Sequence, residues 1–137
     1  MTTSMNESPF VTYRSILVDG DYSAAGFLQN FAMAMYAGGA FPMNASGLHN
    51  LDDRHMRAFQ EMAAWFRRHG EGDPDFVDVC QAIKAQRRAY AQRIKQTLDE
   101  VLASDPDEYE GGRSEHASSV KFYQREHEKN IERLWFS

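Results

Sequence analysis

The residues of this chain best suited to chemistry are charged, and they are separated by sign. The stretch 84–95 holds five cations and no acid, whereas the segment 99–115 that follows holds seven acids against Arg113. Blocks of opposite charge indicate recognition through charge, or a clamp that the chain forms with itself.

Two blocks supply most of the candidate binding residues. The cations of the first are expected to populate one broad helical face beside a tyrosine, which suits a phosphate backbone or single-stranded nucleic acid. The alternative is a solvated face that pairs with the acidic block and adds little stability, and the sequence slightly favours it. The basic block comprises Lys84, Arg87, Arg88, Tyr90, Arg93 and Lys95, and the acidic block comprises Asp105, Asp107, Glu108 and Glu110.

Trp135 is the remaining candidate, in the C-terminal run Leu-Trp-Phe-Ser. Large aromatics at a chain end more often cover a core than anchor a partner. If it is exposed, Trp135 suits a protein interface, where aromatic residues concentrate binding energy.

Patterns that support catalysis or metal binding are lacking in the sequence. No two of the five histidines have the spacing that places metal ligands on one helical face. Cys80 lies on an apolar helical stripe and is expected to be buried rather than reactive. We therefore predict a protein that is not an enzyme and needs neither metal nor cofactor. The least supported alternative is a hydrolase or metal enzyme, with a catalytic site built from scattered carboxylates.

Composition limits the class of protein. The chain has 137 residues, 42% of them hydrophobic, and a net charge of −5, which predicts one globular domain over 9–137 after a disordered polar tail at 1–8. The acidic balance argues mildly against a general duplex-DNA binder. A single cysteine, no secretory signal and no apolar run of about 20 residues predict a soluble cytoplasmic protein with no membrane partner.

Hydrophobic periodicity predicts an all-α fold of about four helices. Asp21 or Ser23 is expected to cap the first helix, Asp52 the second and Asp73 the third, a long helix over 73–103. The last helix is expected over about 115–135. The β-branched and aromatic run Pro9–Val18 instead predicts an N-terminal extended arm or short strand.

The long helix is expected to change character along its length. Its first half, from Phe76 to Ile83, is dense in apolar residues and is predicted to be buried. Its second half, from Arg87 to Lys95, is predicted to expose its cations, because unpaired charges are costly to bury. A double substitution of Arg87 and Arg88 by Glu would then leave the fold intact and damage partner binding.

A family resemblance covers residues 27–66. The pattern Phe27-Leu28, Met35-Tyr36-x-Gly38, Phe41-Pro42 and Leu48-x-x-Leu51-Asp52 resembles a small bacterial domain family of unknown function found on mobile elements such as plasmids and phages. The resemblance implies a genomic context and no activity.

These observations favour a non-enzymatic protein-binding module. The predicted function is a phage- or plasmid-encoded inhibitor of a host defence complex, comparable to anti-CRISPR proteins. The alternative is a nucleic-acid-binding accessory protein that uses the basic middle of the long helix. A homodimer is compatible with either function.

Overall fold

The computed structural model describes residues 7–41 and 43–136, and every regular element in that part of the chain is helical. The all-α prediction is therefore confirmed. The chain divides into two compact units, unit 1 over residues 1–83 and unit 2 over residues 84–137. The single domain expected over 9–137 stays a prediction.

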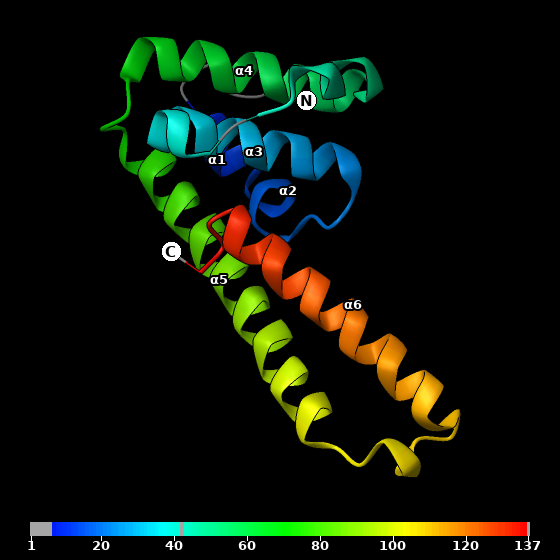
Figure 1. Cartoon of the computed structure of the whole chain (residues 1–137). Helices are drawn as coiled ribbons and strands as arrows, with labels where there is room; N and C mark the ends of the chain where they lie inside the picture. The colour runs from blue at the N-terminus through cyan, green and yellow to red at the C-terminus, as the bar shows by residue number, and fades with distance from the viewer. Residues whose placement is uncertain (1–6, 42, 137) are drawn as a thin grey trace. The chain divides into compact units, whose positions relative to one another are not determined.

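The N-terminal strand was predicted wrongly, because residues 9–19 form two short helices, α1 (Pro9–Thr12) and α2 (Arg14–Asp19) (Figure 1). The hydroxyl of Ser8 accepts a hydrogen bond from the Phe10 amide at 3.1 Å, and Pro9 occupies the first helical turn. Both are helix-start signals. Phe10 and Leu17 are fully buried, so the segment is no free arm. Ser8 belongs to this cap; residues 1–6 of the expected tail lie outside the described residues.

The next two long helices of unit 1 were predicted closely. They are α3 (Ser23–Ala37) and α4 (Asp53–His69), connected through the short 3₁₀ helices η1 (Gly38–Ala40) and η2 (Ala45–Asn50). Asp52 caps α4 by accepting the His55 amide at 2.9 Å, as predicted. The cap of α3 was predicted wrongly: Tyr22 holds that position and makes no side-chain bond there.

The core of unit 1 is built around Phe76, in the first turn of α5 (Pro74–Ala103). Its ring lies 5.1 Å from Phe10, 5.1 Å from Phe66 and 6.1 Å from Tyr36, measured between centroids. Such aromatic pairs add to the stability that their buried area provides. Cys80 is also fully buried, so the predicted burial of the first half of α5 is confirmed.

Unit 2 is a helical hairpin. The remainder of α5 runs antiparallel to α6 (Gly112–Glu132), and the short 3₁₀ helix η3 (Pro106–Glu108) connects them (Figure 1). No helix among the described residues combines the length and the apolar character needed to cross a membrane.

Candidate interaction surfaces of the helical hairpin

Arg87 does not lie on the exposed basic face where it was predicted. Its side chain is buried, and its guanidinium carbon lies 5.1 Å from the ring centroid of Trp135. The physical reason is its register. Arg87 occupies a position of the apolar stripe of α5, facing α6, and an aromatic face offers a buried guanidinium favourable electrostatics.

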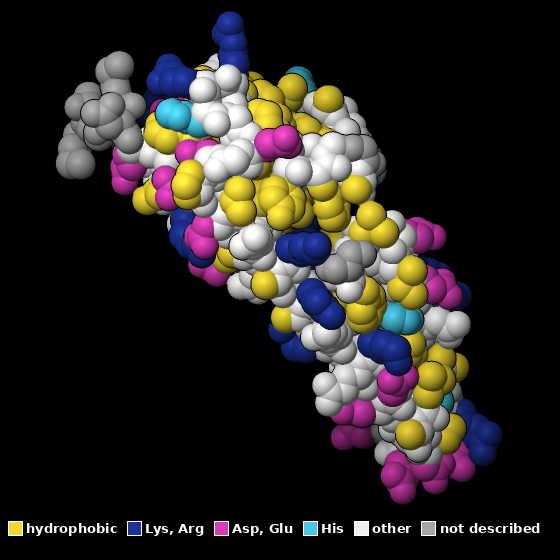
Figure 2. Space-filling model, turned by 90° about the vertical axis from the view of Figure 1, so that its left-hand side faces the viewer, with side chains coloured by type: hydrophobic (Ala, Val, Ile, Leu, Met, Phe, Trp, Pro, Cys, Tyr) yellow, Lys and Arg dark blue, Asp and Glu magenta, His cyan; other side chains and the backbone are white. Residues whose placement is uncertain are grey.

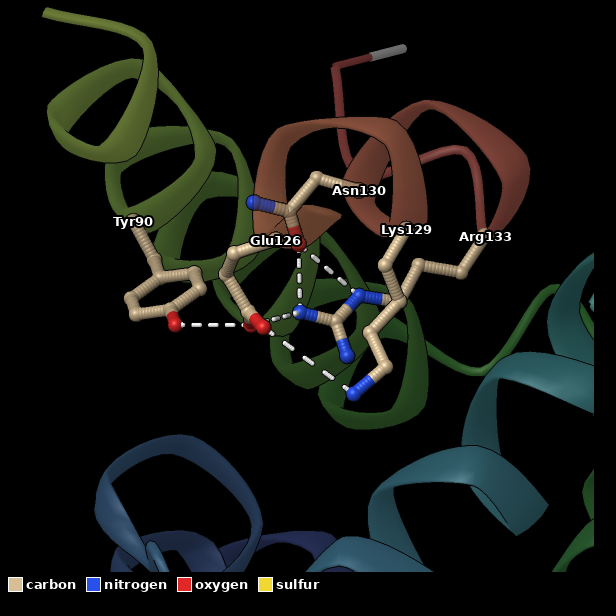
Figure 3. A network of polar contacts seen from close by, with 5 residues as sticks. All are labelled: Tyr90, Glu126, Lys129, Asn130 and Arg133. Carbon is tan, nitrogen blue, oxygen red and sulfur yellow. Dashed lines mark hydrogen bonds and ion pairs between the residues drawn. The ribbon is translucent and has the colours of Figure 1, made fainter. Parts of the chain in front are cut away.

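Beside it, five side chains form a polar network centred on Glu126 (Figure 3). Glu126 Oε1 accepts hydrogen bonds from Tyr90 Oη at 3.0 Å and from Arg133 Nη2 at 3.2 Å, while Lys129 Nζ lies 4.0 Å from Oε2. Arg133 also donates to the buried Oδ1 of Asn130, from Nε at 2.9 Å and from Nη2. The network thus holds Tyr90 of α5 against two turns of α6.

Two pKa values reflect this environment. Burial, followed by the hydrogen bond to Glu126, raises the pKa of Tyr90 above its usual range. Burial lowers the pKa of Arg133, and the neighbouring Glu126 opposes that shift. The network therefore joins the ion pair between Arg133 and Glu126 to the phenol of Tyr90.

Trp135 reaches the network through the C-terminal turn of α6. The Trp135 amide donates to the Asn130 carbonyl at 2.9 Å and the Leu134 amide to the Ile131 carbonyl at 3.2 Å, with Leu134 in the left-handed region at φ 63°. This bond pattern is a Schellman turn. It places the ring centroid of the half-buried Trp135 3.4 Å from the guanidinium carbon of Arg133. Trp135 therefore caps the hairpin, in line with the core-cap alternative.

The other cations of the basic block do not share one face. Helical rotation of about 100° per residue places Lys84, Arg88 and Lys95 within about 40° of one another. Arg93 lies more than about 120° away from them, and its guanidinium is 6.0 Å from the Tyr90 ring. We call Lys84, Arg88 and Lys95, all exposed, the basic stripe. Figure 2 shows a row of dark-blue side chains along unit 2, with yellow side chains beside it.

The acidic block lies where α5 and α6 connect, and magenta side chains gather at that end of unit 2 in Figure 2. We call it the acidic tip: Asp105, Asp107, Glu108 and Glu110, all exposed. Asp105 Oδ1 accepts the Asp107 amide at 2.9 Å, and Arg113 Nε donates to Asp107 Oδ1 at 2.9 Å. These bonds fix the local backbone and neutralise one of the four carboxylates.

The basic stripe and the acidic tip do not pair with each other within the described chain. Lys95 binds Asp99 one turn along the same helix at 3.0 Å, and Asp107 binds Arg113. Lys84 and Arg88 have no ion pair among the described residues. Arg88 and the end of α5 are separated by about 22 Å at 1.5 Å per residue. That distance exceeds the Debye length of about 8 Å at physiological salt.

Asp52, His55 and Tyr22 form a polar cluster in unit 1. Asp52 Oδ1 lies 2.6 Å from His55 Nδ1, and Tyr22 Oη lies 2.8 Å from His55 Nε2. The backbone and side-chain hydrogen bonds from His55 hold the pKa of Asp52 below its usual range. In the described part of the chain, no three His, Cys, Asp or Glu side chains gather closely enough to hold a metal ion.

Several residues of the hairpin were missed from the sequence. Glu126, Asn130 and Arg133 carry the network, and the sequence analysis did not predict a role for them. The only indication of buried charge was Arg87, a charged residue at a position of the apolar stripe. His127 Nδ1 is buried with no hydrogen-bond partner among the described residues, and the centroid of its ring lies 5.4 Å from that of Phe136.

Comparison of the chain with protein-family models, with curated proteins and with solved structures finds no match.

Proposed function

We propose that the chain is a non-enzymatic protein-binding module, and that it acts as a phage- or plasmid-encoded inhibitor of a host defence complex in the cytoplasm. The observation that carries the proposal is the acidic tip, whose carboxylates are exposed on a helical hairpin and neutralised only at Asp107 among the described residues. A rigid presentation of negative charge suits a basic groove that normally holds nucleic acid, because electrostatic complementarity guides such docking.

The internal structure of the hairpin supports this role. The network around Glu126 and the cap formed by Trp135 hold the two helices together, so the tip is carried on an ordered support. Pre-organised charges lose less entropy on binding than charges on a disordered tail. The resemblance to mobile-element domains over residues 27–66 supports the inhibitor role and names no target.

The test is co-migration with candidate defence complexes in size-exclusion chromatography. Asp105→Asn, Asp107→Asn, Glu108→Gln and Glu110→Gln, combined in one variant, should abolish co-migration and leave the melting temperature almost unchanged. The matched control removes four exposed carboxylates elsewhere, through Asp19→Asn, Asp21→Asn, Glu128→Gln and Glu132→Gln. Equal loss of binding in both variants would show a non-specific effect of net charge and contradict a role for the tip.

The alternative function, nucleic-acid binding, is supported by the exposure of the basic stripe. The geometry weakens the case for nucleic-acid binding, because Arg87 is buried, Arg93 lies on another face and Lys95 is already paired with Asp99. Three phosphate contacts predict a salt slope of only about −2.7 for duplex DNA. Electrophoretic mobility at low salt checks this function, and the absence of any shift with DNA or RNA would exclude it.

A further inference from the structure

The polar cluster of unit 1 has the arrangement of a nucleophile, a base and a group that orients the base. Tyr22 Oη lies 2.8 Å from His55 Nε2, and His55 Nδ1 lies 2.6 Å from Asp52 Oδ1. Both distances are those of hydrogen bonds. Groups in this order activate weak nucleophiles on unrelated folds, and they are recognised by their geometry rather than by their sequence positions.

The carboxylate of Asp52 fixes which ring nitrogen of His55 carries a proton. Hydrogen bonds from the backbone and side chain of His55 hold the pKa of Asp52 below its usual range, so Asp52 is ionised and can only accept. The Nδ1 atom of His55 must therefore donate to it. In the neutral ring Nε2 then has a free lone pair, which accepts the hydrogen bond from the Tyr22 hydroxyl. A base is thus held at the phenolic proton.

The side chains of the cluster differ in exposure in the way that such a site requires. His55 is only 7% exposed, and both of its ring nitrogens are hydrogen-bonded, so the base is held in place. Tyr22 is 46% exposed. The two rings are inclined at 87°, so they meet through the hydroxyl and do not stack. A reagent from solvent can therefore reach Tyr22 while the base behind it stays shielded.

Two other tyrosines show what a different partner does to a phenol. Tyr13 and Tyr90 donate to the carboxylates of Glu61 and Glu126. Burial, followed by the hydrogen bond to the carboxylate, raises the pKa of both phenols and so opposes their ionisation. Among the described residues, Tyr22 is the tyrosine whose hydroxyl bonds to an imidazole, which can take up its proton.

We propose that Tyr22 is a nucleophile that accepts an acyl group from an activated carboxylic ester, with His55 as its general base. The phenolic oxygen attacks the carbonyl carbon of the ester while the phenolic proton passes to His55 Nε2. The bond from that carbon to the leaving oxygen then breaks, and the leaving group takes the proton from His55. Asp52 is a positioning residue that stabilises the imidazolium formed between these steps. The products are an acyl ester of Tyr22 and a free alcohol.

The charges near the cluster indicate an uncharged acyl donor. Positions 19–24 and 50–55, which surround the three residues in sequence, hold four aspartates and one arginine. Negative surroundings repel the anionic oxygens of a phosphoryl donor, whereas a carboxylic ester carries no charge at its reacting carbon. The transfer modifies each chain once and involves no partner protein, so the inference goes beyond the proposed function and does not depend on it.

Acetylation of the full chain by para-nitrophenyl acetate tests the inference, because mass spectrometry of peptides locates and counts the acetyl groups. Tyr22 should be acetylated at least about tenfold faster in the wild type than in His55→Gln, since a positioned general base contributes about 10²–10⁴-fold. His49→Gln, which changes an exposed histidine elsewhere in unit 1, is the matched control and should react like the wild type. Equal rates in the wild type and a folded His55→Gln would show that exposure alone sets the reactivity, and would overturn the inference.

The role of Asp52 has its own variant. Asp52→Asn should slow the acetylation of Tyr22 by at least about tenfold, because a neutral amide does not stabilise the imidazolium. Its melting temperature should change little, since asparagine caps a helix as well as aspartate does. Unchanged acetylation in this variant would contradict the positioning role.

Nitrogen-15 spectroscopy of the wild-type protein keeps the inference falsifiable if a variant fails to fold. The neutral ring of His55 should carry its proton on Nδ1. A proton on Nε2 would make His55 a donor to Tyr22 and would overturn the inference. Para-nitrophenyl phosphate is the second reagent, and transfer of its phosphoryl group to Tyr22 in place of the acetyl group would overturn the assignment of an acyl donor.

Discussion

Tyr13 makes the stability of unit 1 depend on pH in the alkaline range. Its hydroxyl donates to Glu61 Oε2 at 2.6 Å, and burial, followed by this bond, raises its pKa to about 12 from the ordinary value of 10.0. A phenol whose pKa is raised by folding stabilises the protein fully below pH 10. The contribution is lost as the pH rises toward about 12.

We therefore predict that Tyr13→Phe removes this pH dependence. Two pKa units correspond to up to about 2.7 kcal/mol. Between pH 9 and pH 12, where the folded phenol is half ionised, the wild type should lose about 2 kcal/mol more stability than the variant. Urea unfolding at both pH values measures the difference. Parallel loss of stability in the two proteins would show that Tyr13 ionises as freely when folded as when unfolded.

Leu134 is a strained residue at the end of α6. It holds the left-handed position of a Schellman turn at φ 63°, where glycine is usual. Leu134→Gly should raise the stability of the hairpin by up to about 1 kcal/mol, because a side chain in this conformation costs about 1–2 kcal/mol. Leu134→Ala is the matched control, since it keeps the Cβ that causes the strain. Thermal melting in which glycine gains nothing over alanine would contradict the assignment.

At the level of elements, the hairpin depends on the buried guanidinium between α5 and α6. Arg87→Glu should destabilise unit 2 by more than about 2 kcal/mol, because it buries a carboxylate against Trp135. Arg88→Glu, one residue along on the exposed side, should change stability by no more than about 0.5 kcal/mol. Denaturant unfolding of the two single variants decides the matter, and equal stability of both would show that Arg87 tolerates either charge.

That prediction revises the expectation that replacing both arginines leaves the fold intact. All cations from Arg87 to Lys95 were predicted to be exposed, because buried charge is costly. The position of Arg87 in the apolar stripe instead indicated that this side chain is buried. The compensating partner, Trp135, lies 48 residues away in the sequence. Contacts between distant segments of this kind are invisible to local patterns.

Helices with clear start and stop residues were predicted well from the sequence. For α4, the predicted cap at Asp52 is confirmed, and Gly70, in the left-handed region at φ 77°, ends the helix. For residues 9–18, the abundance of Val, Ile, Phe and Tyr indicated a strand, and the Ser8-Pro9 helix start was overlooked. Strand propensity mostly measures fit to a packed surface, so helix packing overrides it.

At the scale of the whole molecule, the two units differ in how much core they contain. The principal hydrophobic cluster is formed entirely by residues between Phe10 and Ile83. In the described part of unit 2, only Ala91, Leu98 and Val101 are buried apolar residues. The polar network around Glu126 replaces part of the missing apolar core, and hydrogen bonds of this kind contribute only about 0.5–1.5 kcal/mol each.

We therefore predict that unit 2 opens at a lower free energy than unit 1, because local stability follows the density of buried apolar contacts. Native-state hydrogen exchange should show lower protection for the amides of α6 than for those of α4. Phe76→Ala should reduce protection in α4 by several kcal/mol, since truncating a buried phenylalanine costs about 3–5 kcal/mol. Leu98→Ala is the counterpart in unit 2 and should act mainly on α6. Equal protection of α4 and α6 in the wild type, with both variants lowering them together, would mean that the chain unfolds as one cooperative body despite its two units.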